Sequence, residues 1–266
     1  MYRYLGWRLQ LVVCTSSTYA ALRTPRALKT PRTRIISSMA EAARFDIART
    51  SKEVEVAAAA TIADYASVAE GYAAGNMNHD VSQNIQAMLD PLRSSPIRHA
   101  PFDVLDVCCA SGRDLLALKT LGHRPIGIDG VEQFCEMSRE LSGCEVWQQS
   151  LTELDLPEQR FDAIFCNACL FHVPSVALPD TMRALAGALR PGGTLFVSNA
   201  HGFGEDREGW TNGRTPGTRS YVTWLSEESW VETVKAATGL NLLQLYYRPP
   251  GKLRSQQPFL ATVWQR

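Results

Sequence analysis

Two carboxylates and a run of small residues have the spacing of a nucleoside-binding site. Asp106 precedes the segment 108–112, Cys-Cys-Ala-Ser-Gly, and Asp129 follows it at the end of the segment Gly127-Ile128-Asp129. Small side chains let the backbone turn sharply, and free N–H groups at the start of the next helix then face a ligand. A carboxylate at the tip of the following strand accepts both hydroxyl protons of a ribose. The spacing therefore predicts a nucleoside-like cofactor.

These residues need a βαβ unit to position them. Apolar residues at 104–107 predict a strand, Leu115, Leu116 and Leu118 predict a helix that ends near Gly122, and residues 127–129 predict a second strand. In such a unit the turn and the second carboxylate meet at the same edge of the sheet.

The spacing of the small residues distinguishes between cofactors. A dinucleotide fingerprint, G-x-G-x-x-G, would place its glycines at Cys108, Ala110 and Arg113, and an arginine obstructs the close helix–strand contact. The shorter spacing G-x-G-x-G meets Cys108, Ala110 and Gly112, which are all small. With Asp106 two residues earlier, the segment resembles the first motif of the class I S-adenosylmethionine-dependent methyltransferases, which usually have glycine where Cys108 and Ala110 stand. The resemblance implies S-adenosylmethionine as cofactor and the binding residues Asp106, Cys108, Ala110, Gly112, Arg113 and Asp129. A Rossmann-like domain that binds nothing is the alternative.

Later segments support the same family. Residues 167–174, after a buried strand at 161–166, resemble its fourth motif, and Arg190-Pro191-Gly192-Gly193 separates an amphipathic helix from the next strand. Strands at 240–247 and 259–264 follow each other without a helix, so one of them must be antiparallel. We expect an α/β fold: a doubly wound, Rossmann-like, seven-stranded sheet with a C-terminal antiparallel hairpin and an N-terminal helical lid.

The lid is expected before the first strand. The alanine-rich segment 51–71 predicts a helix, residues 75–79 a loop, Asp80 the cap of a second helix, and residues 91–101 a linker. On the resemblance, Tyr72, His79 and Asp80 contact cofactor or substrate. Loop polarity and an ordinary cap are the alternative explanation.

The resemblance also assigns residues beyond the first motif. Ser150 and Leu151 follow the short third strand, where the family contacts the adenine, and Asn167 is implied to position cofactor or substrate. Methyl transfer requires alignment, exclusion of water and a group that accepts a proton. His172 titrates near neutral pH and is the candidate catalytic base, or alternatively it packs on the cofactor.

The acceptor pocket is expected where loops gather over the carboxyl ends of the strands. A polar loop at 201–220 leads into the next segment there, and arginines among aromatic residues suit a small anionic or aromatic acceptor. Solvated loop charges are the alternative. The predicted substrate-binding residues, besides Tyr72 and His79, are Trp210, Arg214, Arg219 and Tyr221, with Tyr247, Arg248 and Arg254 as further candidates.

The seven cysteines are an odd number and fall mostly inside predicted elements, which favours reduced thiols over a disulfide framework. Four of them end two neighbouring strands, and one hypothesis is that they converge on a thiophilic species. No metal site is assigned. The four are Cys108, Cys109, Cys166 and Cys169.

The charge distribution separates the N-terminus from the rest. Lys+Arg and Asp+Glu both number 27, so no net field favours nucleic acid or an anionic membrane. Residues 1–40 contain no acidic residue and many basic ones, as in an organellar transit peptide. We expect a targeting peptide at 1–38, either transit or signal plus transit, a lid and linker at 39–100, and the methyltransferase core at 101–266. The destination is a chloroplast or mitochondrion, or the cytoplasm if translation starts at Met39.

The predicted function is transfer of a methyl group from S-adenosylmethionine to an O, N or S atom of a small molecule by in-line displacement. A nicotinamide-dependent oxidoreductase and a non-catalytic S-adenosylmethionine-binding module are the alternatives. No membrane span is expected, because the apolar stretch at 9–22 is too short and polar. The sequence leaves the oligomeric state open.

Overall fold

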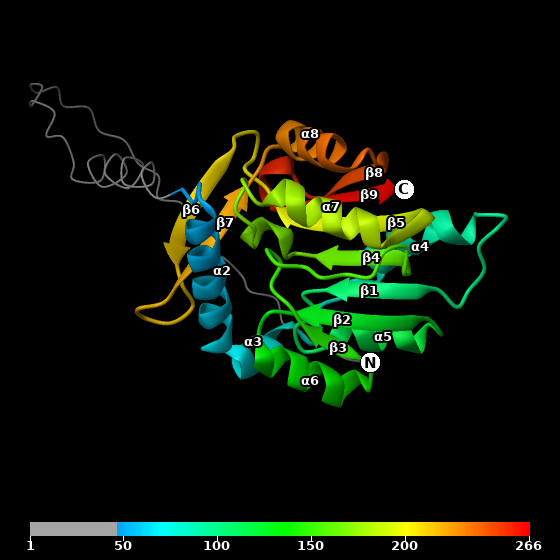
Figure 1. The fold of residues 1–266 in the computed structure, drawn as a ribbon, viewed down its shortest axis with the longest axis horizontal. Helices are drawn as coiled ribbons and strands as arrows, with labels where there is room; N and C mark the ends of the chain where they lie inside the picture. Colours follow the sequence, from blue (N-terminus) through cyan, green and yellow to red (C-terminus); the bar gives the residue numbers. More distant parts are fainter. Residues whose placement is uncertain (1–46) are drawn as a thin grey trace, which may run out of the picture. The chain divides into compact units, whose positions relative to one another are not determined.

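The computed structural model describes residues 47–266, which are built on a seven-stranded sheet (Figure 1). The strand order is β3-β2-β1-β4-β5-β9-β8. The first five strands pair in parallel, and β9 runs antiparallel to both β5 and β8. The expected sheet and its terminal hairpin are confirmed. The strands are β1 (Asp103–Val107), β2 (Arg124–Asp129), β3 (Val146–Gln148), β4 (Phe161–Asn167), β5 (Leu189–Ala200), β8 (Asn241–Arg248) and β9 (Phe259–Gln265).

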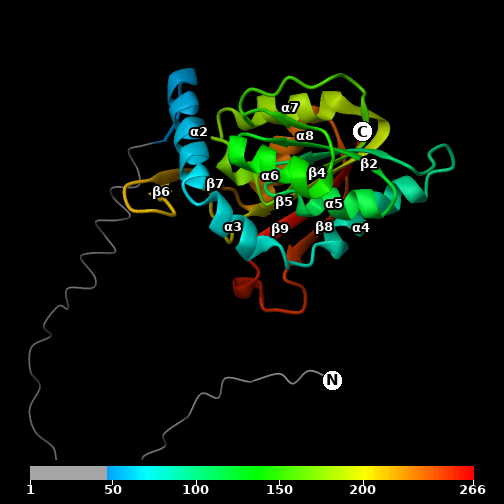
Figure 2. The same ribbon diagram turned by 90° about the horizontal axis from the view of Figure 1, so that it is seen from below.

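Helices cover both faces of the sheet (Figure 2). Leu105 and Val107 of β1 pack with α7 and α8, whereas Val104 packs with α4 and α5. Because successive strand residues point to opposite faces and both faces are covered, these strands are apolar throughout. The covering helices are α4 (Ser82–Arg93), α5 (Arg113–Thr120), α6 (Glu132–Ser142), α7 (Leu178–Ala188) and α8 (Glu227–Thr238).

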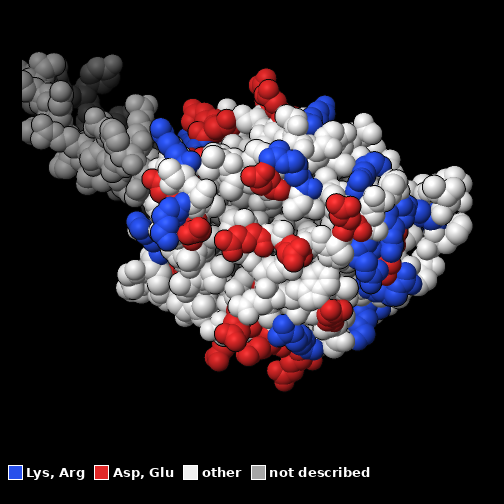
Figure 3. Space-filling model, in the orientation of Figure 1, with Lys and Arg blue, Asp and Glu red and all other residues white. Residues whose placement is uncertain are grey.

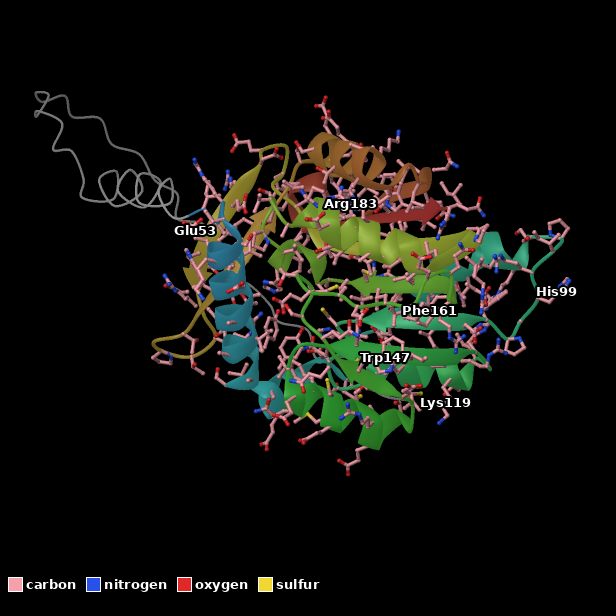
Figure 4. All side chains as sticks on the ribbon, viewed as in Figure 1. Glu53, His99, Lys119, Trp147, Phe161 and Arg183 are labelled. Atoms are coloured by element: carbon pink, nitrogen blue, oxygen red, sulfur yellow. The ribbon has the colours of Figure 1, made fainter. Side chains whose placement is uncertain are left out.

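A lid lies across the carboxyl ends of the parallel strands (Figure 1). It consists of α2 (Ser51–Ala66), α3 (Ala69–Asn76) and a two-stranded hairpin of β6 (Arg207–Asn212) and β7 (Arg219–Trp224). A capping box starts α2, in which Thr50 accepts a hydrogen bond from the Glu53 N–H and Glu53 accepts one from the Thr50 N–H. In Figure 4, Glu53 marks this lid side, and His99 marks the opposite side, where β1 begins.

The structure differs from the expected elements in three places. The single helix predicted over 51–71 is two helices, and α4 continues through Pro91 to Arg93. Moreover, α4 packs against β4, β5 and β9, so it belongs to the layer on the sheet rather than to the lid. The predicted loop at 201–220 contains β6 and the start of β7, because these residues pair with each other and Tyr221 packs on Ala57 of α2.

Within residues 47–266, no helix is long and apolar enough to cross a membrane. The predicted targeting peptide at 1–38 lies outside the described residues.

Candidate active site

The turn between β1 and α5 has alternate residues in the left-handed conformation. The φ angles are 57° at Cys108, 47° at Ala110 and 88° at Gly112. For residues with a Cβ this conformation costs about 1–2 kcal/mol. At Gly112 a Cβ would lie 2.8 Å from Ser138 Oγ and 2.9 Å from Ser138 Cα, so glycine is required there by space as well as by φ. The turn therefore keeps the shape of a glycine-rich loop although only one of its three alternate residues is glycine.

Asp129 at the end of β2 holds this turn and faces a cavity. Its Oδ2 accepts a hydrogen bond from the Ala110 N–H (3.0 Å) and its Oδ1 accepts one from the Val131 N–H (2.9 Å). Burial outweighs these bonds and raises the pKa of Asp129 to about 6. Each oxygen keeps a second lone pair, so the carboxylate can still accept the hydroxyl protons of a diol.

Asp106 lies buried below the turn. Among the residues that the structure describes, its Oδ2 has no hydrogen-bond partner. Burial, and secondarily the charge of Asp114, raises the pKa of Asp106 well above its ordinary value. An unpartnered buried oxygen at this position is a polar atom that a ligand or water can satisfy.

Two cavities adjoin under the lid, with volumes of about 110 Å³ and about 800 Å³. Asp129, Ser150, Leu151 and His172 line the smaller one. The larger one is lined by His79 and Asp80, which follow α3, and by three arginines, Arg113, Arg214 and Arg248. Residues that line both cavities mark where they meet: Tyr65, Tyr72, Cys108, Ala110, Asn167 and Ala168.

His172 is held by hydrogen bonds at both ring nitrogens. Nδ1 lies 2.8 Å from the Tyr221 carbonyl oxygen and Nε2 lies 2.9 Å from the Tyr65 hydroxyl. A carbonyl only accepts, so Nδ1 carries the hydrogen and Nε2 accepts from Tyr65. Burial lowers the pKa of His172 to about 4, which leaves the ring neutral near pH 7. The Nε2 lone pair of His172, the predicted base, is therefore occupied by the Tyr65 hydroxyl, and a substrate proton would reach it through that hydroxyl.

Arg113 connects the turn to the lid. Its Nε and Nη2 donate to the Asp114 carboxylate at 2.6 and 2.9 Å, and its Nη1 donates to the Asn76 carbonyl at 2.9 Å. The guanidinium thus joins the first turn of α5 to the end of α3.

Four of the candidate substrate-binding residues lie outside the lining of both cavities: Trp210, Arg219, Tyr221 and Tyr247. The rings of Trp210 and Tyr221 contact each other edge to face at 5.3 Å, and the Arg219 guanidinium lies 3.8 Å from the Trp210 ring centre. The Tyr221 hydroxyl donates to Glu208, and the Tyr221 backbone carbonyl accepts from His172. The Tyr247 hydroxyl donates to Glu227, away from the cavities. The Arg254 side chain lies outside the described part.

Two residues without an assigned role in the sequence analysis contribute to the site. Tyr65 makes the hydrogen bond to His172 Nε2. The Asn84 amide donates to Asn167 Oδ1 (3.0 Å) and accepts from the Tyr246 hydroxyl (3.1 Å). This bond fixes the orientation of the Asn167 amide at the junction of the cavities. The sequence signal that could have identified Asn84 is an amide on the apolar face of its predicted helix, beside Ile85 and four residues before Met88.

The four thiols do not converge. Cys169 contacts the thiols of Cys108 and Cys166, but Cys109 Sγ accepts a hydrogen bond from Ser138 (3.4 Å) and packs with Leu115. The hypothesis of a four-thiol site is wrong because Cys109 points to the other side of the turn. Within the described residues, no group of three or more His, Cys, Asp or Glu side chains could hold a metal ion.

Known proteins resemble this chain in both sequence and fold. Residues 104–193 match the family model described as a methyltransferase domain. The ubiquinone biosynthesis O-methyltransferase of Xanthomonas axonopodis pv. citri is 32% identical over 120 residues, which cover 41% of this chain and 49% of that protein. The one from Idiomarina loihiensis is 34% identical over 101 residues, 36% of this chain and 41% of that protein. The chain thus spans less than half the length of these curated relatives.

Solved structures share the fold. The 1,6-didemethyltoxoflavin-N1-methyltransferase of Burkholderia thailandensis, solved with 1,6-didemethyltoxoflavin and S-adenosylhomocysteine, superimposes with a TM-score of 0.64 at 20% identity and covers 83% of this chain and 92% of its own. An S-adenosylmethionine-dependent methyltransferase from Clostridium acetobutylicum gives 0.58 at 15% identity, over 76% of this chain and 98% of its own. Residues 104–193 therefore match a methyltransferase domain, and the described residues share the fold of S-adenosylmethionine-dependent methyltransferases.

The residues present fit the cofactor of this family. The Asp129 carboxylate that faces the smaller cavity suits a ribose, and the buried Asp106 oxygen without a partner lies below the turn that would face the amino-acid part. Ser150 and Leu151, which line the same cavity as Asp129, would contact the base.

Proposed function

We propose that the protein transfers a methyl group from S-adenosylmethionine to a small-molecule acceptor, with oxygen as the favoured acceptor atom. The observation that carries this proposal is the junction of the two cavities, where Asn167 meets a tyrosine–histidine hydrogen-bond chain. The relatives named O-methyltransferases support oxygen, although this chain matches less than half of their length. Nitrogen and sulfur acceptors remain alternatives that the substrate assay below separates.

The cofactor, when bound, supplies a methyl group on a sulfonium that leaves as a neutral thioether. The chain's own residues then have to align the acceptor, exclude water and accept a proton. α2, α3 and the β6–β7 hairpin would exclude water, and the fixed Asn167 amide would orient the acceptor.

The Tyr65–His172 chain offers a route for the proton. We propose that Tyr65 Oη takes the proton from the acceptor hydroxyl while the Tyr65 proton passes to His172 Nε2. His172 Nδ1–H keeps its hydrogen bond to the Tyr221 carbonyl oxygen, and this bond stabilises the imidazolium that forms on His172. A hydroxyl that is being methylated becomes a strong acid, so a histidine with a pKa of about 4 is basic enough to accept its proton. It then returns the proton to solvent near pH 7.

Two measurements test the function. Calorimetry should show binding of S-adenosylhomocysteine, and incubation with isotopically labelled S-adenosylmethionine and a panel of hydroxyl, amine and thiol metabolites should label one class. Tyr65→Phe should then lower kcat at least about tenfold with little change in the affinity for S-adenosylhomocysteine. Binding of the cofactor without label transfer to any class would instead favour the non-catalytic module.

We also propose that residues 1–38 direct the chain to a chloroplast or mitochondrion. Support comes from the acid-free, basic composition of that segment. A fluorescent protein fused behind residues 1–38 should accumulate in one of these organelles, whereas the same protein fused to a chain starting at Met39 should not. A cytoplasmic distribution of both fusions would contradict the proposal.

A further inference from the structure

Two arginines from different elements line the larger cavity. Arg214 lies in the connection between β6 and β7, and Arg248 ends β8. They reach the same space of about 800 Å³ although the sequence separates them. Neither residue takes part in the proton route proposed above.

The Arg214 guanidinium is fixed on one side only. Nη1 donates to Asp64 Oδ2 (2.6 Å) and to Ser220 Oγ (3.1 Å), and the guanidinium carbon lies 3.5 Å from the centre of the Tyr65 ring. Between residues 47 and 266, the structure shows no hydrogen bond from its Nε or Nη2. These two nitrogens form one edge of the guanidinium, whose geometry matches a carboxylate. The buried Asp64 thus orients Arg214 and leaves that edge for a ligand.

Arg248 provides a second donor without a partner. Its Nε is buried and makes no hydrogen bond within the described part of the chain. A buried donor without a partner is unfavourable, and a bound acceptor atom removes that cost.

The acidic residues that line this cavity do not satisfy these donors. Asp114 accepts both of its hydrogen bonds from Arg113, and the exposed Asp80 accepts one from the Ser82 N–H. Asp80 lies close enough to Arg248 for its pKa to be lowered by it, after the larger effect of the Ser82 hydrogen bonds. No hydrogen bond between Asp80 and Arg248 is formed in the described structure.

We infer that the methyl acceptor carries a carboxylate, which Arg214 and Arg248 bind in the larger cavity. Planar aromatic acids fit best, because the rings of Tyr65, Tyr72 and Phe171 line the same space. This inference rests on the proposed function and names its substrate class.

The test compares acids with their neutral counterparts by binding, not turnover. Calorimetry on the full chain saturated with S-adenosylhomocysteine would use 3,4-dihydroxybenzoate against catechol and 4-hydroxybenzoate against phenol. The acid should bind at least about tenfold more tightly in one pair, as expected for a charge-assisted bidentate contact. Arg248→Gln should remove most of this preference and leave the affinity for the neutral compound unaffected. Arg214→Gln should also remove most of it, and because this change breaks the pair with Asp64, it is judged by the ratio of the two affinities. Arg214→Lys should restore part of it.

Controls separate this inference from the function itself. Arg207→Gln, at an exposed position of the same hairpin, should keep the preference, and thermal unfolding should show that each variant is folded. If Arg214→Gln does not fold, Arg248→Gln still decides. The inference is overturned if the acid binds no more tightly than its neutral counterpart in either pair, or if none of the compounds binds. It is also overturned if Arg248→Gln keeps the preference for the acid. Failure to bind S-adenosylhomocysteine would instead overturn the proposed function.

Discussion

At the scale of single residues, Gly112 is the position in the turn at 108–112, here called the cofactor turn, where a larger side chain is least tolerated. Its φ is 88° and an added Cβ would meet the Ser138 backbone, whereas Gly122 has a φ of 84° and open space around it. Gly122→Ala should therefore lower the free energy of unfolding by the conformational cost alone, about 1 kcal/mol. Gly112→Ala should lower it by a further 1–3 kcal/mol, roughly the cost of overpacking. Urea unfolding of both variants measures the difference, and equal losses would show that Ser138 yields without cost.

The raised pKa of Asp129 should make cofactor binding depend on pH. Its pKa is raised from 3.8 to about 6 by burial, so below about pH 6 the unliganded protein holds a proton that the two ribose hydroxyls must displace. The affinity for S-adenosylhomocysteine should rise up to about tenfold per pH unit below pH 6 and level off above it. The sign for stability is opposite: the raised pKa stabilises the protonated native state below 3.8, and this contribution is lost as pH rises to about 6.

Calorimetry between about pH 5 and about pH 8 measures this dependence. In Asp129→Asn the slope should disappear and the affinity should fall about tenfold or more, the value of hydrogen bonds to a charged group. Glu132→Gln, exposed on α6, is the matched control and should keep the slope. A flat profile in the unmodified protein would show that Asp129 is ionised throughout or does not contact the cofactor.

At the scale of elements, Asp64 fastens α2 to the β6–β7 connection. The buried carboxylate accepts hydrogen bonds from the Arg214 N–H (2.7 Å), Arg214 Nη1 (2.6 Å), Thr218 Oγ1 (2.5 Å) and Ser220 Oγ (2.5 Å). Burial alone would raise the pKa of Asp64, but these bonds lower it from 3.8 to about 2. Since the pKa is lowered on folding, this contribution to stability is present above 3.8 and is lost as pH falls through about 2.

Asp64→Asn should therefore loosen the lid. Removing one member of a buried ion pair costs about 3–5 kcal/mol, so amide hydrogen exchange in α2 and in the hairpin should accelerate at least about tenfold. Amides of β1 and β4 should exchange as before, because the sheet core does not contain Asp64. Glu55→Gln, on the exposed face of α2, is the control. Unchanged exchange in the hairpin would mean that apolar packing of Tyr221 holds the lid by itself.

The same elements show what local sequence can predict. α8 follows Ser226, whose side chain accepts a hydrogen bond from the Ser229 N–H, and ends at Gly239 with a φ of 69°, as its caps predict. The cofactor turn was also recognisable, because its small residues are contiguous. The docking of the β6–β7 connection on Asp64 and the Tyr65–His172 pair were not recognisable, since these contacts join residues 150 and 107 positions apart in the chain. Local periodicity carries no information about such contacts.

At the scale of the whole described domain, the two edges of the parallel sheet have different tasks. The carboxyl ends of the strands carry the cofactor turn and both cavities, whereas the amino ends carry a network of ion pairs. Figure 3 shows basic side chains gathered on the side from which the strands start in Figure 1. In this network Arg190 Nη1 donates to Asp103 and to Asp162 at 2.9 Å each, and Arg98 also pairs with Asp162. The network joins the starts of β1, β4 and β5 and contacts neither cavity.

Asp162→Ala should therefore affect stability but not binding. The nearly buried carboxylate accepts from the Asp103 N–H as well as from two arginines, and its loss leaves Arg98 and Arg190 with fewer partners. We expect a decrease of about 3 kcal/mol in the free energy of unfolding, as for other buried pairs broken on one side. Asp180→Ala, which breaks an exposed pair with Arg183, should cost less than about 1 kcal/mol. The affinity for S-adenosylhomocysteine should stay within about twofold in both, because the strands remain paired and the turn lies at their other ends. A weakened affinity in folded Asp162→Ala would show that strain at the amino edge reaches the cofactor turn through β1 and β4.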